Sequence, residues 1–175
     1  MPADDFDFLF GRWAVAHRRL RDALDPGCVE WLELAGTCEA WPLLSTGGHV
    51  DRFVIPAYVD GEPFEGSTLR LLDPATDLWS IHWSSTRSPG RLDPPVVGRF
   101  RGDVGTFTGA EVIGGESALV RFTWHRRASP RWQQELSYDA GASWFVNWVM
   151  DFARGQTQAP QYAEQAPGST TSPLL

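Results

Sequence analysis

The chain has 175 residues, of which 42% are hydrophobic and 21% charged, which is usual for one globular domain. Its formal net charge of -7 argues against a nucleic-acid partner, and because it has no lysine, Schiff-base and Walker-lysine chemistry are excluded. The first residues show neither a signal peptide nor an apolar membrane span, and Cys28 and Cys38 have no metal or redox spacing, so we expect a cytoplasmic protein with no membrane partner.

Residues 1–10 predict one short helical turn, which Asp4 or Asp5 would cap and whose Phe6, Leu9 and Phe10 would plug one end of a barrel. After this turn come ten runs rich in Val, Thr, Phe and Trp, each bounded by Gly, Pro or Asp, which is typical of strands. These runs are 12–21, 29–41, 48–58, 66–73, 78–85, 95–101, 105–113, 118–127, 131–138 and 143–154.

The links between the runs carry hairpin signals such as Asp60-Gly61 and Gly114-Gly115, so consecutive strands should be antiparallel neighbours. A meander of this length hides its edges most simply by closing on itself. We therefore predict an all-β, up-and-down antiparallel barrel over residues 1–154, with room inside for one small ligand. Residues 155–175 are rich in Gln, Pro, Ser and Thr and should form an extended or disordered tail.

The segment SYDAGASW, residues 137–144, matches the Asp-box of sialidase-type propellers. Asp139 can accept hydrogen bonds from turn amides, Gly141 can adopt a positive φ, and Trp144 can pack into the barrel wall. A propeller needs several such boxes, and this chain has one. Because the acidic residues are expected mainly in turns or on outer faces, we interpret the motif as a structural hairpin and exclude a glycosidase.

A second pattern lies at the entry of the first strand, where Gly11 and Trp13 form G-x-W after an aromatic turn. This opening resembles that of lipocalins and fatty-acid-binding proteins, the calycin superfamily. The resemblance is closest to uncharacterised bacterial lipocalin-like proteins, through FDFLFGRWAVAHRRL and the late SYDAGASWFVNW, with Ala140 replacing a glycine of their pattern. It implies a barrel whose cavity floor is Trp13 covered by Arg154, and implies no particular chemistry.

Alternation along the strands selects the side chains that should face inward. His17 and Arg19 share the inward face of the first strand and are the catalytic candidates, as a proton carrier and an anion holder. In the last strand both faces are apolar, and we take the face of Trp144, Val146 and Trp148 as inward. The predicted ligand-binding residues are Trp13, Val15, Trp79, Ile81, Trp83, Phe122, Trp124, Trp132, Gln134 and Trp148.

These residues predict a monomeric or homodimeric barrel that encloses a small apolar or aromatic molecule, for instance a polyketide-like one. The alternative is a cofactor-free isomerase, cyclase or lyase acting in the same cavity. A third hypothesis is a haem barrel like nitrobindin, although the G-x-W-x-G-x-G opening is absent. No metal or cofactor is expected, since the pair His49 and Asp51 has no third ligand nearby in sequence.

Overall fold

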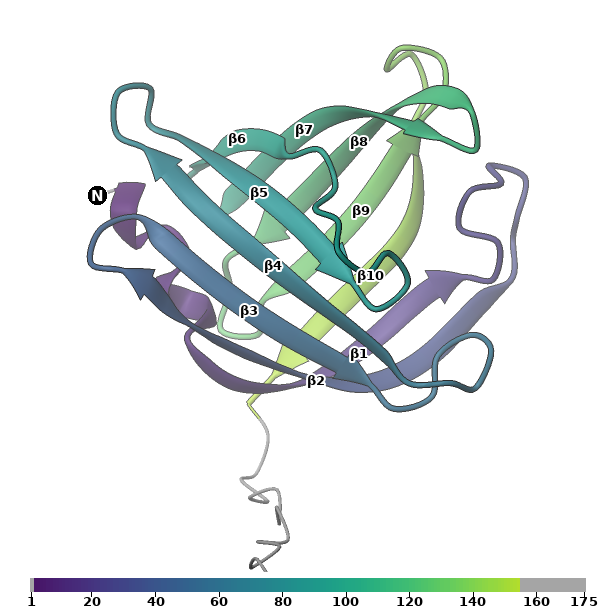
Figure 1. Ribbon diagram of the computed structural model, residues 1–175, viewed down its shortest axis with the longest axis horizontal. Helices are drawn as coiled ribbons and strands as arrows, with labels where there is room; N and C mark the ends of the chain where they lie inside the picture. Colours follow the sequence, from purple (N-terminus) through teal and green to yellow (C-terminus); the bar gives the residue numbers. More distant parts are fainter. Residues whose placement is uncertain (1, 155–175) are drawn as a thin grey trace, which may run out of the picture.

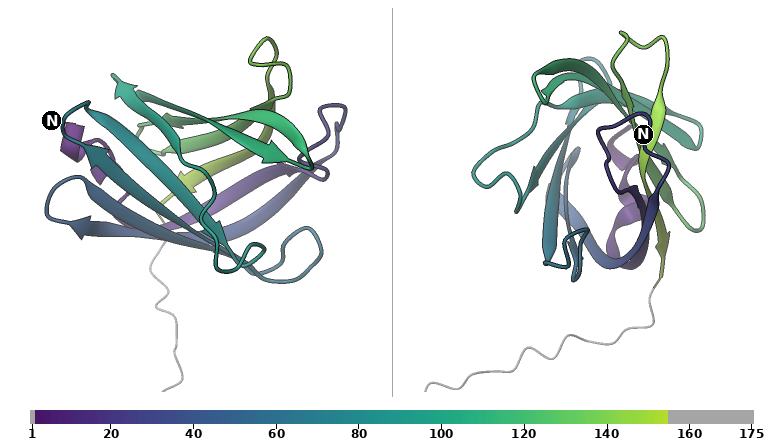
Figure 2. Two further views of the ribbon diagram at one scale, coloured as in Figure 1. Left: turned by 45° about the horizontal axis from the view of Figure 1, so that its top comes forward. Right: turned by 90° about the vertical axis from the view of Figure 1, so that its right-hand side faces the viewer.

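The computed structural model describes residues 2–154 and shows a closed barrel of ten antiparallel strands (Figure 1). Each strand pairs with its neighbours in sequence, and β1 pairs with β10 to close the ring, as Figure 2 shows from one end. The predicted all-β up-and-down barrel is therefore confirmed, and its shape is compatible with a calycin-type fold. The strands are β1 (Gly11–Leu20), β2 (Trp31–Leu44), β3 (Gly48–Ile55), β4 (Phe64–Asp73), β5 (Leu78–Ser85), β6 (Val96–Arg101), β7 (Val104–Ile113), β8 (Glu116–His125), β9 (Arg131–Ser137) and β10 (Phe145–Ala153).

The predicted strand boundaries agree with the structure to within a few residues, because Gly, Pro and Asp mark the turns. In β1 the alternation is also as predicted: Trp13, Val15 and His17 are buried, whereas Ala14 and Ala16 are exposed. The predicted tail, residues 155–175, lies outside the described residues. Within residues 2–154, no helix has both the length and the apolar character that a membrane crossing requires.

The N-terminal segment plugs one end of the barrel through two 3-10 turns, η1 (Pro2–Asp4) and η2 (Asp7–Leu9). Phe6, between the turns, is fully buried, and its ring centroid lies 5.1 Å from those of Trp79 and Phe100. The predicted plug is thus present, but Phe6 occupies the N-cap position of η2 with no side-chain cap, in place of the expected aspartate. The aromatic contacts, not a cap, hold this segment in position.

The closed end of the barrel has the contact between Trp13 and Arg154 that the calycin resemblance implies, although Trp13 does not form the floor of the cavity at the other end. Trp13 donates a hydrogen bond of 2.7 Å from its indole nitrogen to the carbonyl of Leu9. The guanidinium carbon of Arg154 lies 3.6 Å from the centre of the Trp13 ring, and one of its N–H groups donates to the carbonyl of Phe10 at 2.9 Å. The beginning and the end of the barrel are therefore joined by a cation–π contact at the closed end.

A buried ion pair lies beneath the plug, between Arg70 of β4 and Asp51 of β3. Their side chains are only 3% and 6% exposed. The guanidinium of Arg70 also lies 4.9 Å from the ring centre of Phe6 and 5.5 Å from that of Trp124. The interior next to the plug therefore contains two opposite charges that neutralise each other within the protein.

A β-bulge in β10 corrects part of the sequence prediction. Val146 pairs with Glu135 and Trp148 pairs with Gln134, so Asn147 is an additional residue in β10. Trp148 and Met150 face the interior as predicted, but the bulge reverses the alternation before them. Val146 therefore lies on the outer face, and Trp144 lies outside the barrel with its ring centre 4.0 Å from the guanidinium carbon of Arg121.

The turn between β9 and β10 is the structural hairpin that the SYDAGASW motif predicts. One carboxylate oxygen of Asp139 accepts hydrogen bonds of 2.8 Å from the Ser137 hydroxyl and the Ser143 amide, and the other accepts a bond of 2.6 Å from the Ser143 hydroxyl. Gly141 has a φ of 91°, as predicted, but Ala140 also has a positive φ, 56°. The replacement of glycine by alanine at position 140 thus places a Cβ atom in the left-handed region.

Candidate functional site

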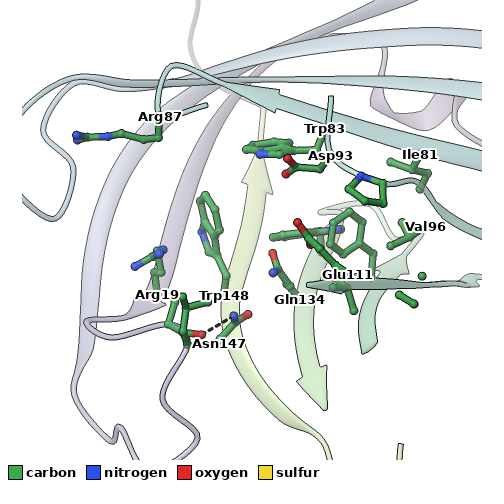
Figure 3. A pocket seen from close by; sticks show the side chains of 18 of the residues that line it. Arg19, Ile81, Trp83, Arg87, Asp93, Val96, Glu111, Gln134, Asn147 and Trp148 are labelled. Carbon is green, nitrogen blue, oxygen red and sulfur yellow. Dashed lines mark hydrogen bonds between the residues drawn. The ribbon is translucent and has the colours of Figure 1, made fainter. Parts of the chain in front are cut away.

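A cavity of about 280 Å³ lies inside the end of the barrel opposite the plug (Figure 3). It is lined by the last residues of β1, β5 and β7, the first residues of β10, and the loops that join β3 to β4 and β5 to β6. The volume is at the lower limit of ligand pockets, which are about 300 to 1,000 Å³. The barrel is thus solid at its closed end and hollow at its open end.

Three tryptophans form the inner walls of this cavity. The ring centroid of Trp148 lies 6.3 Å from that of Trp83, at an interplanar angle of 82°, and 5.9 Å from that of Trp132, at 78°. Phe122 packs against Trp132 at 5.0 Å. The rings therefore stand almost perpendicular to one another and enclose the space on several sides, as in sites that hold a flat apolar body or an organic cation.

Gly66, in the neighbouring strand β4, leaves room for the ring of Trp83. A Cβ atom added to Gly66 of β4 would lie 2.3 Å from the ring of Trp83 and 2.8 Å from that of Phe53. The two rings stack at 5.1 Å over this position. Glycine at position 66 thus allows Trp83 to lie flat against the inner surface of the sheet, with the cavity on its other side.

Two amide side chains of the cavity have unused hydrogen-bonding capacity. Asn147, only 2% exposed, donates from Nδ2 to the carbonyl of Ala23 at 2.8 Å, whereas its Oδ1 is buried without a partner. The side chain of Gln134 has no hydrogen bond to any residue among 2–154. A buried amide oxygen without a donor is costly, so Oδ1 of Asn147 is suited to accept a hydrogen bond from a ligand. The half-buried amide of Gln134 is free to bind one as well.

The charged residues of the cavity are separated by sign. Figure 3 shows Arg19 and Arg87 on one side and Asp93 and Glu111 on the other. The guanidinium of Arg19 lies 5.2 Å from the ring centre of Tyr58 and 5.6 Å from that of Trp148, and donates to the carbonyl of Leu20 at 3.1 Å. The cavity is therefore polarised across its width.

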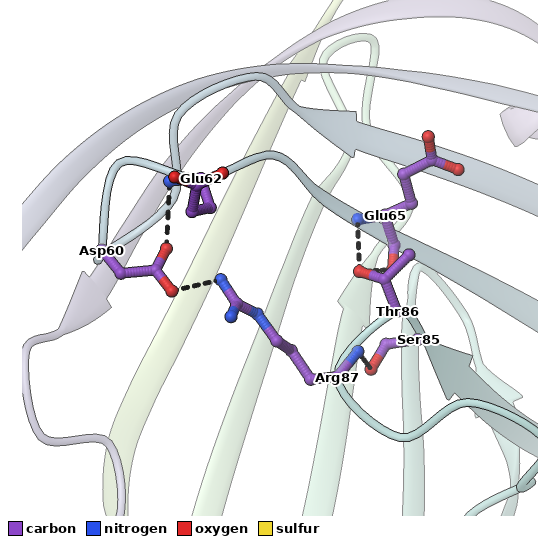
Figure 4. Close-up of polar contacts among 6 residues, drawn as sticks. All are labelled: Asp60, Glu62, Glu65, Ser85, Thr86 and Arg87. Carbon is purple, nitrogen blue, oxygen red and sulfur yellow. Dashed lines mark hydrogen bonds and ion pairs between the residues drawn. The ribbon is translucent and has the colours of Figure 1, made fainter.

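The rim on the arginine side is held by a polar clamp between two loops (Figure 4). Arg87 donates a hydrogen bond of 2.6 Å to Asp60, whose other oxygen accepts from the amide of Glu62 at 3.1 Å. Beside this pair, the amide of Thr86 donates to the carbonyl of Glu65 at 3.0 Å. The charge of Arg87 is thus compensated within the protein, and the two loops are fixed relative to each other.

The two carboxylates on the opposite side are not compensated in this way. Neither carboxylate has an ion pair or a hydrogen bond with a residue in the described part of the chain. Burial raises the pKa of Asp93, and it raises the pKa of Glu111 together with repulsion from Asp93, although Arg91 opposes both shifts. The free protein therefore holds negative charge here at a cost.

His17, the leading catalytic candidate, is not among the residues that line the cavity. It is 1% exposed and lies behind Trp148, whose indole N–H donates to its Nδ1 at 3.3 Å. Its Nε2 has no partner and points at Gly36, where a Cβ atom would come within 2.9 Å. Burial lowers the pKa of His17 to about 4, so the imidazole is neutral at pH 7 and supports the position of Trp148.

The structure brings most of the other predicted site residues together and leaves a few apart. Trp124 borders only a void of about 30 Å³ beneath the cavity. Trp13, Val15 and Trp79 line neither the cavity nor this void and pack in the hydrophobic core. Of the predicted residues, those that line the cavity are Arg19, Ile81, Trp83, Phe122, Trp132, Gln134 and Trp148.

Sequence reasoning missed several residues that line the cavity. Glu111 is on the same alternating face of β7 as the buried Phe107, a signal that could have identified it and that corrects the placement of the acidic residues in turns or on outer faces. Asp93 and Tyr58 are on loops, where alternation gives no information, and the bulge concealed Asn147. Comparison with known protein families and with curated proteins found nothing that matches the chain.

The structure gives no support for a metal or haem site among the described residues. Within residues 2–154, no three His, Cys, Asp or Glu side chains are grouped as metal ligands. Asp51 pairs with Arg70, and His49 lies 3.4 Å from Asp7. No histidine lines the cavity or the void beneath it, so the described residues offer no axial imidazole there.

Proposed function

We propose that this protein binds a small, largely apolar or aromatic molecule in the cavity at the open end of the barrel. The observation that carries the proposal is the combination of perpendicular tryptophan walls with two polar groups that lack partners, Oδ1 of Asn147 and the side-chain amide of Gln134. Ligand pockets are typically apolar with a few such groups that fix orientation. The resemblance to lipocalin-like proteins, whose barrels enclose small molecules, supports the same function.

Calorimetric titration with 2-naphthalenemethanol, a neutral aromatic probe, tests this function. Val120 lines the cavity, and Val120→Phe should fill it and weaken binding by about tenfold or more. Val112, on the outer face of β7 and 70% exposed, provides the control Val112→Phe, which should bind as the wild type does. If naphthalene probes of every charge fail to bind, or if Val120→Phe binds as well as the wild type, the proposal is wrong.

A cofactor-free isomerase, cyclase or lyase is the second candidate function, and the carboxylates of Asp93 and Glu111 favour it. Carboxyl groups with raised pKa in a cavity are suited to general acid–base catalysis. They would replace His17 as the proton carrier. Each ligand that binds is incubated with the wild type and with Glu111→Gln and analysed by chromatography. A product formed only by the wild type supports catalysis, whereas unchanged recovery of every ligand contradicts it.

A further inference from the structure

We propose that the ligand is an organic cation, a protonated amine on an apolar or aromatic body, whose charge is received by the carboxylates of Asp93 and Glu111. This inference rests on the proposed function, since it assigns a chemical class to the ligand of the same cavity. It depends on three independent features of the cavity wall, namely its acceptors, its aromatic faces and the separation of its charges.

The first feature is the set of acceptors. The carboxylates of Asp93 and Glu111 line the cavity, and neither forms an ion pair or a hydrogen bond with another residue of the described chain. The Oδ1 atom of Asn147 is a further acceptor, on a side chain that is 2% exposed and whose Nδ2 is already bound to Ala23. An ammonium group has three N–H donors and no acceptor, so it matches this set of oxygens.

The second feature is the aromatic walls. Trp83, Trp132 and Trp148 present ring surfaces to the same space as the carboxylates. The face of an indole ring attracts a cation, most strongly where water is excluded. A cation between these rings would gain both from the ring faces and from the carboxylates, whereas a neutral ligand would gain from neither charge effect.

The third feature is the separation of the charges. The guanidinium of Arg19 lies against Tyr58 and Trp148 on the side opposite to Glu111 (Figure 3). The charge of Arg87 is taken up by Asp60 at 2.6 Å. An amine would therefore bind with its cationic end toward β7 and the loop between β5 and β6, and its apolar body toward Trp148.

The raised pKa values of Asp93 and Glu111 agree with this assignment. Burial disfavours the charge of both carboxylates in the free protein, and repulsion from Asp93 adds to this for Glu111, so a cation bound beside them removes a cost as well as adding an attraction. An ammonium group should therefore bind more favourably to these two partly buried carboxylates than to a fully hydrated carboxylate on the surface.

The experiment compares three probes that share a naphthalene ring: 2-naphthylmethylamine, 2-naphthalenemethanol and 2-naphthylacetate, titrated calorimetrically at pH 7.5. The amine should bind about tenfold tighter than the alcohol, and the carboxylate weakest. In the double variant Asp93→Asn/Glu111→Gln, the amine should lose this advantage while the alcohol binds as before, which also shows that the variant is folded. Glu33→Gln removes a charge from an exposed position of β2 and should change nothing.

The outcomes separate this inference from the proposed function. If no probe binds the wild type, the proposed function fails, and this inference with it. If the alcohol binds but the amine is no better, or if the carboxylate binds best, the cavity binds ligands but is not a cation site, and the inference is overturned. An amine preference that persists in the double variant would also overturn it, because another group would then carry the recognition.

Discussion

Breaking the ion pair between Arg70 and Asp51 should destabilise the barrel strongly. Both side chains are almost completely buried, at 3% and 6% exposure, so each single substitution leaves one charge without its partner and away from water. Asp51→Asn and Arg70→Met should each lower the free energy of unfolding by about 3 to 5 kcal/mol. That is a large part of the roughly 5 to 15 kcal/mol that holds a domain of this kind folded.

Urea denaturation followed by tryptophan fluorescence measures these losses, and a double-mutant cycle isolates the coupling. The double variant Asp51→Asn/Arg70→Met leaves no unpaired charge. Its loss in free energy of unfolding should therefore be smaller than the sum of the losses in the two single variants. Glu65→Gln breaks the exposed pair with Arg52 in the same hairpin, at 2.8 Å, and should cost less than about 1 kcal/mol. Single losses as small as that of Glu65→Gln, or fully additive losses, would refute the role of the buried pair.

Four further predictions concern single positions. The pKa of His17 falls from 6.5 to about 4 on folding, so the unfolded chain binds the proton first as the pH is lowered. Between pH 6.5 and 4 the free energy of unfolding of the wild type should therefore fall by up to about 3 kcal/mol through this group, a loss that His17→Gln should not show. Equal acid sensitivity of the two proteins in urea titrations would contradict this. Ala140→Gly relieves a φ of 56° and should raise the melting temperature, whereas a lower one would show that Ala140 is unstrained. Asp139→Ala should lower the melting temperature without changing probe affinity, and a loss of affinity alone would make the turn part of the site. Glu111→Gln should raise the melting temperature of the free protein at pH 7, because its raised pKa means that ionisation favours unfolding there; an unchanged or lower value would contradict this reading.

The fold was predictable because its signals are local. Turn residues separate the ten strands, and the alternation of Trp13, Val15 and His17 identifies the inner face of β1 without knowledge of any partner strand. Closure into a barrel then follows from the need to pair the edge strands. The contact of Arg154 with Trp13 came from the resemblance, since the two residues are too far apart in sequence for any local pattern to connect them.

The site was predictable only in part, because its polar groups depend on features without a local pattern. Alternation places Arg19, Trp83 and Gln134 inward, but it does not say how far along the barrel axis each side chain lies. His17 was therefore expected in the cavity, although the cavity lies nearer the open end than His17 does. The bulge at Asn147 reverses which side chains face inward, and no residue in its vicinity signals it. Asp93 reaches the cavity from a loop, where the chain path is set by tertiary contacts.

The plug also determines on which side of the barrel the protein can be attached to a surface or to a fusion partner. Residues 2 and 154 both lie on the side of the plug (Figures 1 and 2), where Arg154 covers Trp13. The cavity opens at the other end. A fusion partner or a surface linkage that joins the chain at either of these residues departs from the side facing away from the opening. Sensor surfaces and affinity resins attached at residue 2 or at residue 154 would therefore leave the cavity opening directed to the solution.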